Sequence, residues 1–295
     1  MKRRITVGSL TFDIANTIFL LFCGFITMYP FWYIFVYSIS NASRAAGAGF
    51  LLFPLGFTLD NYISVFTQAN ILRALFVSVS RTVIGTIGGV FCCSLFAYLL
   101  TKELLPFRKF MYRALLVTMY LSPGLIPWFI VMRGLGLQNN FLLYVLPTLI
   151  SAFNVVLIKT YIESIPGSME ESAFIDGAGY FRVYAQIIFP LSLPVIATVA
   201  IFTTVGQWSS WVDNLFLANI PRLQTLQLLL YQYVVGAEAQ LANIKNQLRG
   251  DVRLVITPTS IRMTITMVAT IPILIVYPVM QKYFIKGIML GAIKG

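Results

Sequence analysis

The sequence contains no histidine and only three cysteines among its 295 residues. Cys23, Cys92 and Cys93 lie inside long apolar runs, so their pattern implies neither a disulfide framework nor a zinc site. The G-x-S-x-G nucleophile motif and the G-x-x-x-x-G-K-S/T phosphate loop are both missing. We therefore expect a non-catalytic chain that holds no metal or cofactor of its own and is not its own P-loop ATPase.

Charged residues are also scarce: they make up 11% of the chain, against 58% hydrophobic residues, and the mean hydropathy is +0.83. This composition exceeds the apolar content of soluble domains and indicates an integral membrane protein. The apolar windows are continuous rather than alternating, and about 20 helical residues cross a hydrocarbon core, so helices are favoured over barrel strands. Six windows free of Asp, Glu, Lys and Arg predict an all-α protein, a single transmembrane domain over 1–295, with spans near 14–40, 82–100, 114–132, 141–158, 191–212 and 263–281.

The same windows provide no carboxylate or histidine at membrane depth. Proton-coupled carriers usually keep such a group there as a relay, so a self-powered secondary transporter is disfavoured. Two possibilities remain. The chain is either a membrane pathway driven by another protein, or a passive or structural subunit.

Lys and Arg in short loops indicate the orientation of the spans. The N-terminus, the 101–113 loop and the C-terminus are all basic, and six spans place them on one side. We predict that this side, with both termini, is cytoplasmic. The opposite side is also basic, mostly in longer loops that count less toward topology. Its cations are Arg44, Arg73, Arg81, Arg133, Arg222, Lys245, Arg249, Arg253 and Arg262.

An acidic connection, residues 159–189, separates two of the apolar windows. Ser168 and Glu171 have capping-box spacing, which predicts a short helix that starts at Ser168. Gly177 and Gly179 offer left-handed or bent backbone where that helix ends. A second short helix is expected to follow over 180–189. An ordinary capped linker helix would explain these features equally well. The connection holds four of the ten acidic residues, Glu163, Glu170, Glu171 and Asp176, and its expected close-packing positions are Ala173, Phe174 and Ala178.

Particular stretches favour a more specific interpretation: Ile165-Pro166, Glu170-Glu171-Ser-Ala, Ile175-Asp-Gly-Ala178, Ile187 and Pro190-Leu191. Together they resemble the EAA motif of permease subunits from binding-protein-dependent ABC importers, with Ser172 in place of the commoner Ala. The resemblance implies a helix that docks on an ATPase and couples its closure to transport. The motif positions assigned to this role are Glu170, Glu171, Ala173, Asp176, Gly177 and Ala178.

Stretches along the whole chain resemble the polysaccharide and oligosaccharide branch of this family. They are Pro30-Phe-Trp-Tyr33, Leu59-Asp-Asn-Tyr62, Gly124-Leu-Ile-Pro127, Gly206-Gln-Trp208 and the tail Gln281 to Gly295. The resemblance implies a type I importer permease of six helices in the bacterial cytoplasmic (inner) membrane, surrounded by membrane lipid. It also implies a second permease, two ATPase subunits that bind ATP and Mg, an extracytoplasmic solute-binding protein and an oligosaccharide substrate, with no nucleic acid.

A sugar pathway needs aromatic faces and a few polar groups. Gln207, Trp208, Trp211 and Asn214 supply both near the end of the fifth window. Tyr120 and Trp128, in the third window, are further candidates. Each Trp can equally be an interfacial anchor, because Trp gathers at membrane surfaces.

The basic outer loops suggest an acidic oligosaccharide, such as a polyuronate fragment or an alginate-like chain, because positive clefts concentrate anions. The same charges could instead meet a binding protein or only solvent. A permease for another solute, such as peptides or polyamines, and a structural membrane subunit also remain open.

Overall fold

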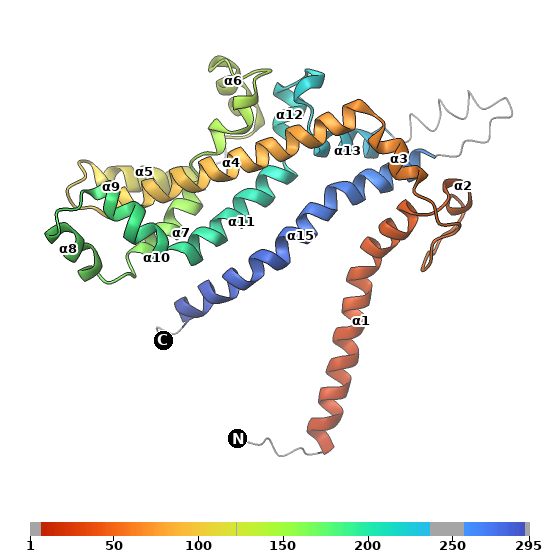
Figure 1. Cartoon of the computed structure of the whole chain (residues 1–295), viewed down its shortest axis with the longest axis horizontal. Coiled ribbons are helices and arrows are strands. Elements are labelled where there is room, and N and C mark those ends of the chain that lie inside the picture. The colour runs from red at the N-terminus through yellow and green to blue at the C-terminus, as the bar shows by residue number, and fades with distance from the viewer. Residues whose placement is uncertain (1–6, 122, 237–256, 293–295) are drawn as a thin grey trace. The chain divides into compact units, whose positions relative to one another are not determined.

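The computed structural model describes residues 7–121, 123–236 and 257–292. Within these ranges the regular elements are helices, apart from one isolated antiparallel bridge between Ser40 and Phe57 (Figure 1). The prediction of an all-α protein is confirmed for the described part of the chain. The predicted outer cations Lys245, Arg249 and Arg253 lie outside the described residues. The chain divides into two compact units, residues 1–68 with 232–270 and residues 69–231 with 271–295.

The first unit contains α1 (Val7–Ser38), α2 (Ala42–Ala45), α3 (Asp60–Phe66) and the beginning of α15 (Pro258–Ala292). The helices predicted near 14–40 and 263–281 are confirmed, and α15 continues through two internal prolines. Most of the apolar side chains of α1 are exposed in the isolated chain, as expected for a helix that faces lipid or another subunit.

The core of the first unit lies where α1 ends. Val36, Tyr37 and Leu51 are buried there. The buried Asn61 side chain donates to the carbonyl oxygens of Ser38 and Ser40, at 2.9 Å each. These bonds satisfy carbonyl groups that the end of α1 leaves without helical partners.

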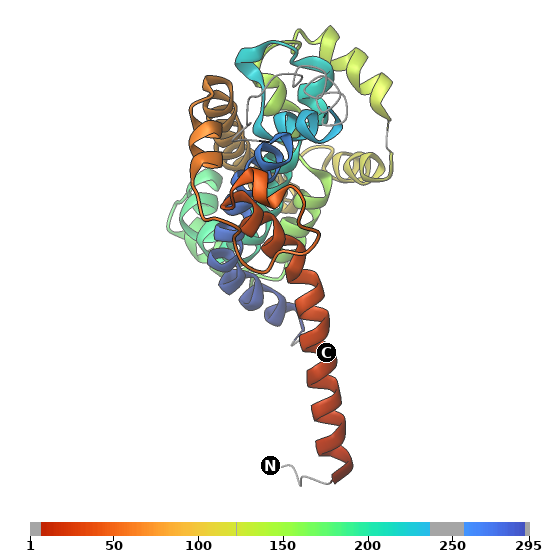
Figure 2. The ribbon, with the colours of Figure 1, turned by 90° about the vertical axis from the view of Figure 1, so that its right-hand side faces the viewer.

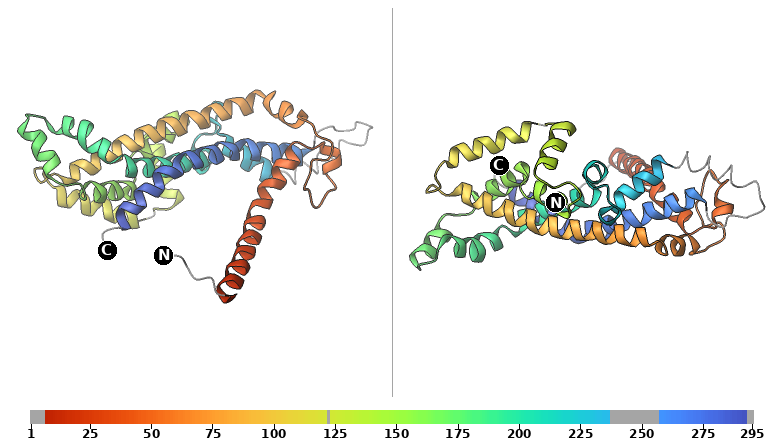
Figure 3. Two further views of the ribbon diagram at one scale, coloured as in Figure 1. Left: turned by 60° about the horizontal axis from the view of Figure 1, so that its bottom comes forward. Right: turned by 90° about the horizontal axis from the view of Figure 1, so that it is seen from above.

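The second unit is built on α4 (Ala69–Thr101), against which α7 (Ala152–Ile162) and α11 (Leu193–Ser209) pack; α4 and α11 run side by side in Figures 1 and 3. Glycines permit the close approach. A Cβ at Gly85 would lie 2.5 Å from the Gln207 side chain, and one at Gly88 would lie 2.8 Å from Leu149. Small residues spaced three apart on one helix face allow such contacts between membrane helices.

The third apolar window, in which a span near 114–132 is predicted, is not one helix. Helix α5 (Arg108–Tyr120) ends before the break, and α6 (Leu125–Gly134) begins after it; Figure 2 shows them as two separate rods. Leu121 is extended, and Gly124 has a φ of 74° and a ψ of 177°. Pro123 cannot donate a backbone hydrogen bond, so the Pro-Gly pair ends the helix.

Two further windows contain bends. The window near 141–158 holds two short 3₁₀ turns, η1 (Phe141–Tyr144) and η2 (Leu146–Thr148), which meet α7 at 43°. The segments Tyr180–Leu191 and Leu193–Ser209 meet at 82°. Helix α11 ends at Ser209, short of the predicted end at residue 212.

Three helices of the described residues are long and apolar enough to cross a membrane: Leu10–Ser38, Asn70–Thr101 and Pro258–Ile275. The number rises to five if each bent pair forms one span. Six continuous spans are therefore not seen in the described chain, because Pro and Gly interrupt the apolar windows.

Candidate functional site

The acidic connection forms two short helices, as predicted. Helix α8 (Ser168–Ile175) is followed by α9 (Tyr180–Val183), a π-helical turn (Tyr184–Ile188) and α10 (Phe189–Leu191). The predicted capping box is wrong, however. Gly167 occupies the N-cap position with helical backbone angles, so Ser168 already lies in the first turn, where its carbonyl oxygen accepts from Ser172 Oγ at 2.9 Å.

Helix α8 ends in a Schellman motif. The amide of Gly177 donates to the Phe174 carbonyl oxygen and the amide of Ala178 to that of Ala173, at 3.0 Å each. Gly177 has a φ of +79°, which side chains rarely tolerate and glycine adopts freely. The predicted left-handed backbone is confirmed at Gly177. Gly179 is not left-handed, with a φ of −77° and a ψ of 162°, and it directly precedes α9.

The surface of α8 is mostly exposed. Ala173 is buried against the core that includes Tyr98, Val183 and Tyr184, whereas Ile175 is 86% exposed. The close-packing expectation is thus confirmed for Ala173. It is weaker for Phe174, which remains exposed with its ring edge-on to Tyr180. Met169, Glu171, Asp176 and Tyr180 are among the other exposed residues of this segment.

An ion pair ties α8 to the end of α4. Lys102 Nζ pairs with Glu170 Oε2, and the ammonium lies 4.2 Å from the centre of the Tyr98 ring. Glu170 is therefore engaged within the chain, while its neighbour Glu171 is exposed. Of the two adjacent glutamates, only Glu171 offers a carboxylate to solvent or a partner.

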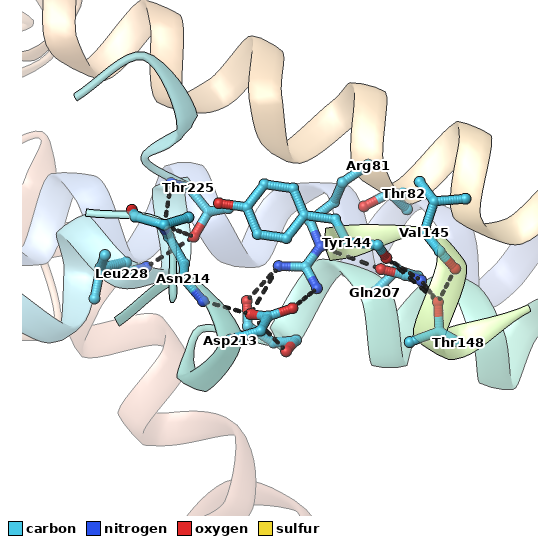
Figure 4. A network of polar contacts seen from close by, with 12 residues as sticks. Arg81, Thr82, Tyr144, Val145, Thr148, Gln207, Asp213, Asn214, Thr225 and Leu228 are labelled. Atoms are coloured by element: carbon cyan, nitrogen blue, oxygen red, sulfur yellow. Dashed lines mark hydrogen bonds and ion pairs between the residues drawn. The ribbon is translucent and has the colours of Figure 1, made fainter. Parts of the chain in front are cut away.

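A buried polar network joins α4 to the segment after α11 (Figure 4). The Arg81 side chain is 1% exposed and reaches Asp213 Oδ2 at 2.5 Å and Oδ1 at 3.2 Å. Its Nε donates to Gln207 Oε1 at 3.1 Å, and its guanidinium lies 4.4 Å from the centre of the Tyr144 ring. A buried arginine is thus paired, hydrogen-bonded and stacked, which is the arrangement that makes burial of its charge tolerable.

Gln207 and Asn214 extend the network in opposite directions. Gln207 Nε2 donates to the Tyr144 carbonyl oxygen at 3.1 Å and to Thr148 Oγ1 at 2.6 Å. Asn214 lies in α12 (Val212–Leu217), and its Oδ1 accepts from the Thr225 amide at 2.7 Å. Both side chains are almost fully buried, and their polar atoms bond within the chain. In this structure they stabilise the fold, and neither presents a free group to a ligand.

Sequence reasoning missed this network. It placed Arg81 among the outer loop cations and treated the membrane helices as free of charge, yet Arg81 lies within α4 and is buried. Arg81 and Asp213 stand immediately outside the second and fifth apolar windows and have opposite charges. These opposite charges at the edges of two windows were the sequence signal that could have predicted the ion pair.

The remaining predicted pathway residues are dispersed. Trp208 is buried in α11, and Trp211 stacks on Tyr231 with ring centroids 4.0 Å apart. Tyr120, at the end of α5, is 83% exposed, and Trp128 in α6 packs partly against the core containing Leu143. Their role as pathway residues stays a prediction.

Similar proteins identify the family. A polygalacturonan/rhamnogalacturonan transport system permease protein, YtcP of Bacillus subtilis, is 36% identical over 96% of this chain and 98% of its own length. The chain belongs to the family of ABC-transporter permeases. Protein LplC of the same organism is 36% identical to the permease over 98% of this chain and 97% of its own. No protein-family model matches the sequence.

A solved structure agrees with this assignment. The permease superposes with a TM-score of 0.85 and 27% identity on a chain from a bacterial ABC transporter involved in the import of the acidic polysaccharide alginate, over 95% of this chain and 99% of that one. The likeness shows the fold of an ABC importer permease.

Proposed function

We propose that the permease forms half of an ATP-driven importer that moves oligosaccharides across the bacterial cytoplasmic membrane. The fold match over 95% of the chain to an alginate importer carries this proposal. The polygalacturonan/rhamnogalacturonan relative supports a saccharide substrate. The complete transporter would contain a second permease, two ATPase subunits that bind ATP and Mg, and an extracytoplasmic solute-binding protein, so hydrolysis would take place on partner chains.

Six spans with both termini in the cytoplasm are part of the proposal. The three long helices and two bent pairs account for five spans, and α5 with α6 would be the broken sixth. Exposed Ser168 and Thr67 would then lie on opposite sides of the membrane. Single cysteines at Ser168→Cys and Thr67→Cys, in a cysteine-free background, should label oppositely with an impermeant reagent in intact cells. External labelling at position 168 would overturn this topology.

Helix α8 is proposed as the segment that docks on the ATPase. Exposed Glu171 and Asp176 provide charge, and exposed Ile175 provides apolar contact area. Buried Ala173 and the motif at Gly177 fix the helix to the permease. A short helix held at one face and free at the other can transmit a rigid-body movement to the helices behind it.

The substrate is proposed to be acidic. Both the alginate importer and the polygalacturonan relative are named for uronate polymers. Under the proposed topology the outer side carries the exposed cations Arg44, Arg73, Arg133 and Arg222, which favour the approach of anions.

Purification of the complete transporter tests the function. We expect an ATPase to co-purify and its hydrolysis to rise when the binding protein is loaded with a saccharide, with uronate oligomers more effective than neutral oligomers of equal length. Stimulation by peptides or polyamines instead would indicate another solute. Absence of any ATPase would indicate a structural subunit and contradict the proposal.

A further inference from the structure

A polar pocket of about 470 Å³ lies between two loops of the second unit. The first loop follows α6 and leads into η1, and the second includes the 3₁₀ turn η4 (Pro221–Leu223). Its volume falls in the range of about 300–1,000 Å³ that is typical of small-molecule sites. Under the proposed topology both loops are on the outer side of the membrane. The residues that matter below are Gln138, Asn139, Phe141, Arg222 and Leu223.

The two loops are held together by hydrogen bonds of Asn139. The Asn139 amide donates to the Leu217 carbonyl oxygen at 2.8 Å, and Asn139 Oδ1 accepts from the Asn219 amide at 2.9 Å. The first loop is also fixed at its start, because Gly136 has a φ of +71° and ends α6 in a Schellman motif. The pocket is therefore preformed, which reduces the ordering entropy that a ligand must overcome.

The lining provides the groups that bind an acidic sugar. Arg222 is exposed and has no carboxylate partner among the residues of the described ranges. Its guanidinium matches the planar, two-oxygen geometry of a carboxylate. The exposed Gln138 and the remaining amide hydrogens of Asn139 can bond to hydroxyl groups, and Phe141 offers an apolar face.

The pocket also contacts the buried network. Tyr144 Oη donates to the Leu223 carbonyl oxygen at 2.6 Å, and the Tyr144 and Phe141 rings meet edge-on with centroids 5.8 Å apart. Tyr144 also contacts Arg81, whose guanidinium lies 4.4 Å from the centre of the Tyr144 ring. Tyr144 thus connects two walls of the pocket to the contact between α4 and α11.

We propose that this pocket is a subsite for a uronate unit of the transported oligosaccharide, with Arg222 as the residue that selects the carboxylate. Gln138 and Asn139 orient the sugar hydroxyls, and Phe141 contacts the ring. This inference rests on the proposed function and adds a specific site to it. The exposed lining of the pocket differs from the buried candidates Gln207 and Asn214, whose polar groups form hydrogen bonds within the chain.

The test uses the complete transporter in lipid nanodiscs without the binding protein. Trigalacturonate and its carboxyl-reduced, neutral counterpart are the probes, and Arg222→Gln is compared with Arg133→Gln. Arg133 is an exposed cation on α6 that does not line the pocket. We expect Arg222→Gln to weaken trigalacturonate binding about ten-fold, or about 1.4 kcal/mol, and to leave the neutral probe unchanged. Arg133→Gln should bind both probes as the wild type does, and added salt should weaken only trigalacturonate.

Several results would overturn the subsite. They are no measurable trigalacturonate binding to the wild type, equal binding by wild type and Arg222→Gln, or, in a second measurement with the binding protein added, unchanged saccharide affinity with weakened docking of that protein. The last outcome would make the pocket a protein-docking surface. If saccharides still stimulate ATP hydrolysis in these cases, only the subsite fails. If no saccharide stimulates hydrolysis, the proposed function itself fails.

Discussion

Helix α8 exposes its polar side chains, whereas the network around Arg81 buries them. In α8 a single alanine is buried, while Glu171 and Asp176 are exposed. In the network, Arg81 and Gln207 are 1% and 3% exposed, and their polar groups are bonded within the chain. A satisfied buried network fixes the relation between helices, whereas exposed groups remain available to a partner. The permease therefore separates the surface suited to a partner from the contacts that hold its helices together.

The largest expected effect is from breaking the buried ion pair. Asp213→Asn removes the charge that balances Arg81 and should destabilise the permease by about 3–5 kcal/mol, since an unpaired buried charge remains. The check is thermal unfolding in detergent. The double variant Arg81→Met with Asp213→Leu should recover most of the loss, because no charge is then buried. Wild-type stability of Asp213→Asn alone would contradict a structural role for the network.

A smaller loss is expected where α4 and α11 meet. The Cβ introduced by Gly85→Ala would lie 2.5 Å from Gln207 Nε2, so the network or the helices must shift, at about 1–3 kcal/mol. Gly206→Ala, on α11, is the matched control because its Cβ would meet no atom within 4 Å. The midpoint of thermal unfolding should fall for Gly85→Ala only. Equal midpoints would indicate that Gln207 moves aside freely.

The glycines after α8 give a matched pair with a functional readout. Gly177→Thr places a β-branched side chain at a φ of +79°, with local strain of about 1–2 kcal/mol, while Gly179→Thr places it at −77°. Neither Cβ would meet a neighbouring atom within 4 Å. We expect Gly177→Thr to insert normally, but to lose uptake and hold the ATPase weakly, with Gly179→Thr close to wild type. Normal uptake by Gly177→Thr would contradict the coupling role of α8.

The smallest effect concerns the Lys102–Glu170 pair, which is partly exposed. Glu170→Gln should change stability by only about 0.2–1 kcal/mol, since solvent screens such pairs. The exposed pair of Lys159 and Glu163, probed with Glu163→Gln, is the control and should behave similarly. Thermal unfolding at two salt concentrations measures both. A loss above about 2 kcal/mol at Glu170 would indicate that this pair, and not only Ala173, holds α8 in place.

Several local features could be predicted from the residues. The left-handed Gly177 and the helices near 14–40, 82–100 and 263–281 depend on neighbours only a few positions away, whereas the capping box that predicted the helix start at Ser168 does not form. The break before Leu125 could not be predicted, because a Pro-Gly pair can either bend a helix or end it, and packing decides between these outcomes.

The amino-acid sequence by itself determined that this is a helical membrane protein, because low charge and long apolar windows favour helices that cross a bilayer. It also determined the turn at Gly177, since only glycine adopts that backbone freely. The tertiary structure alone decided that Arg81 is buried, that it meets Asp213 132 positions away, and that Arg222 remains unpaired among the described residues. The physical reason is range: backbone preferences act over a few residues, whereas the partner of a charge depends on which helices the fold brings together.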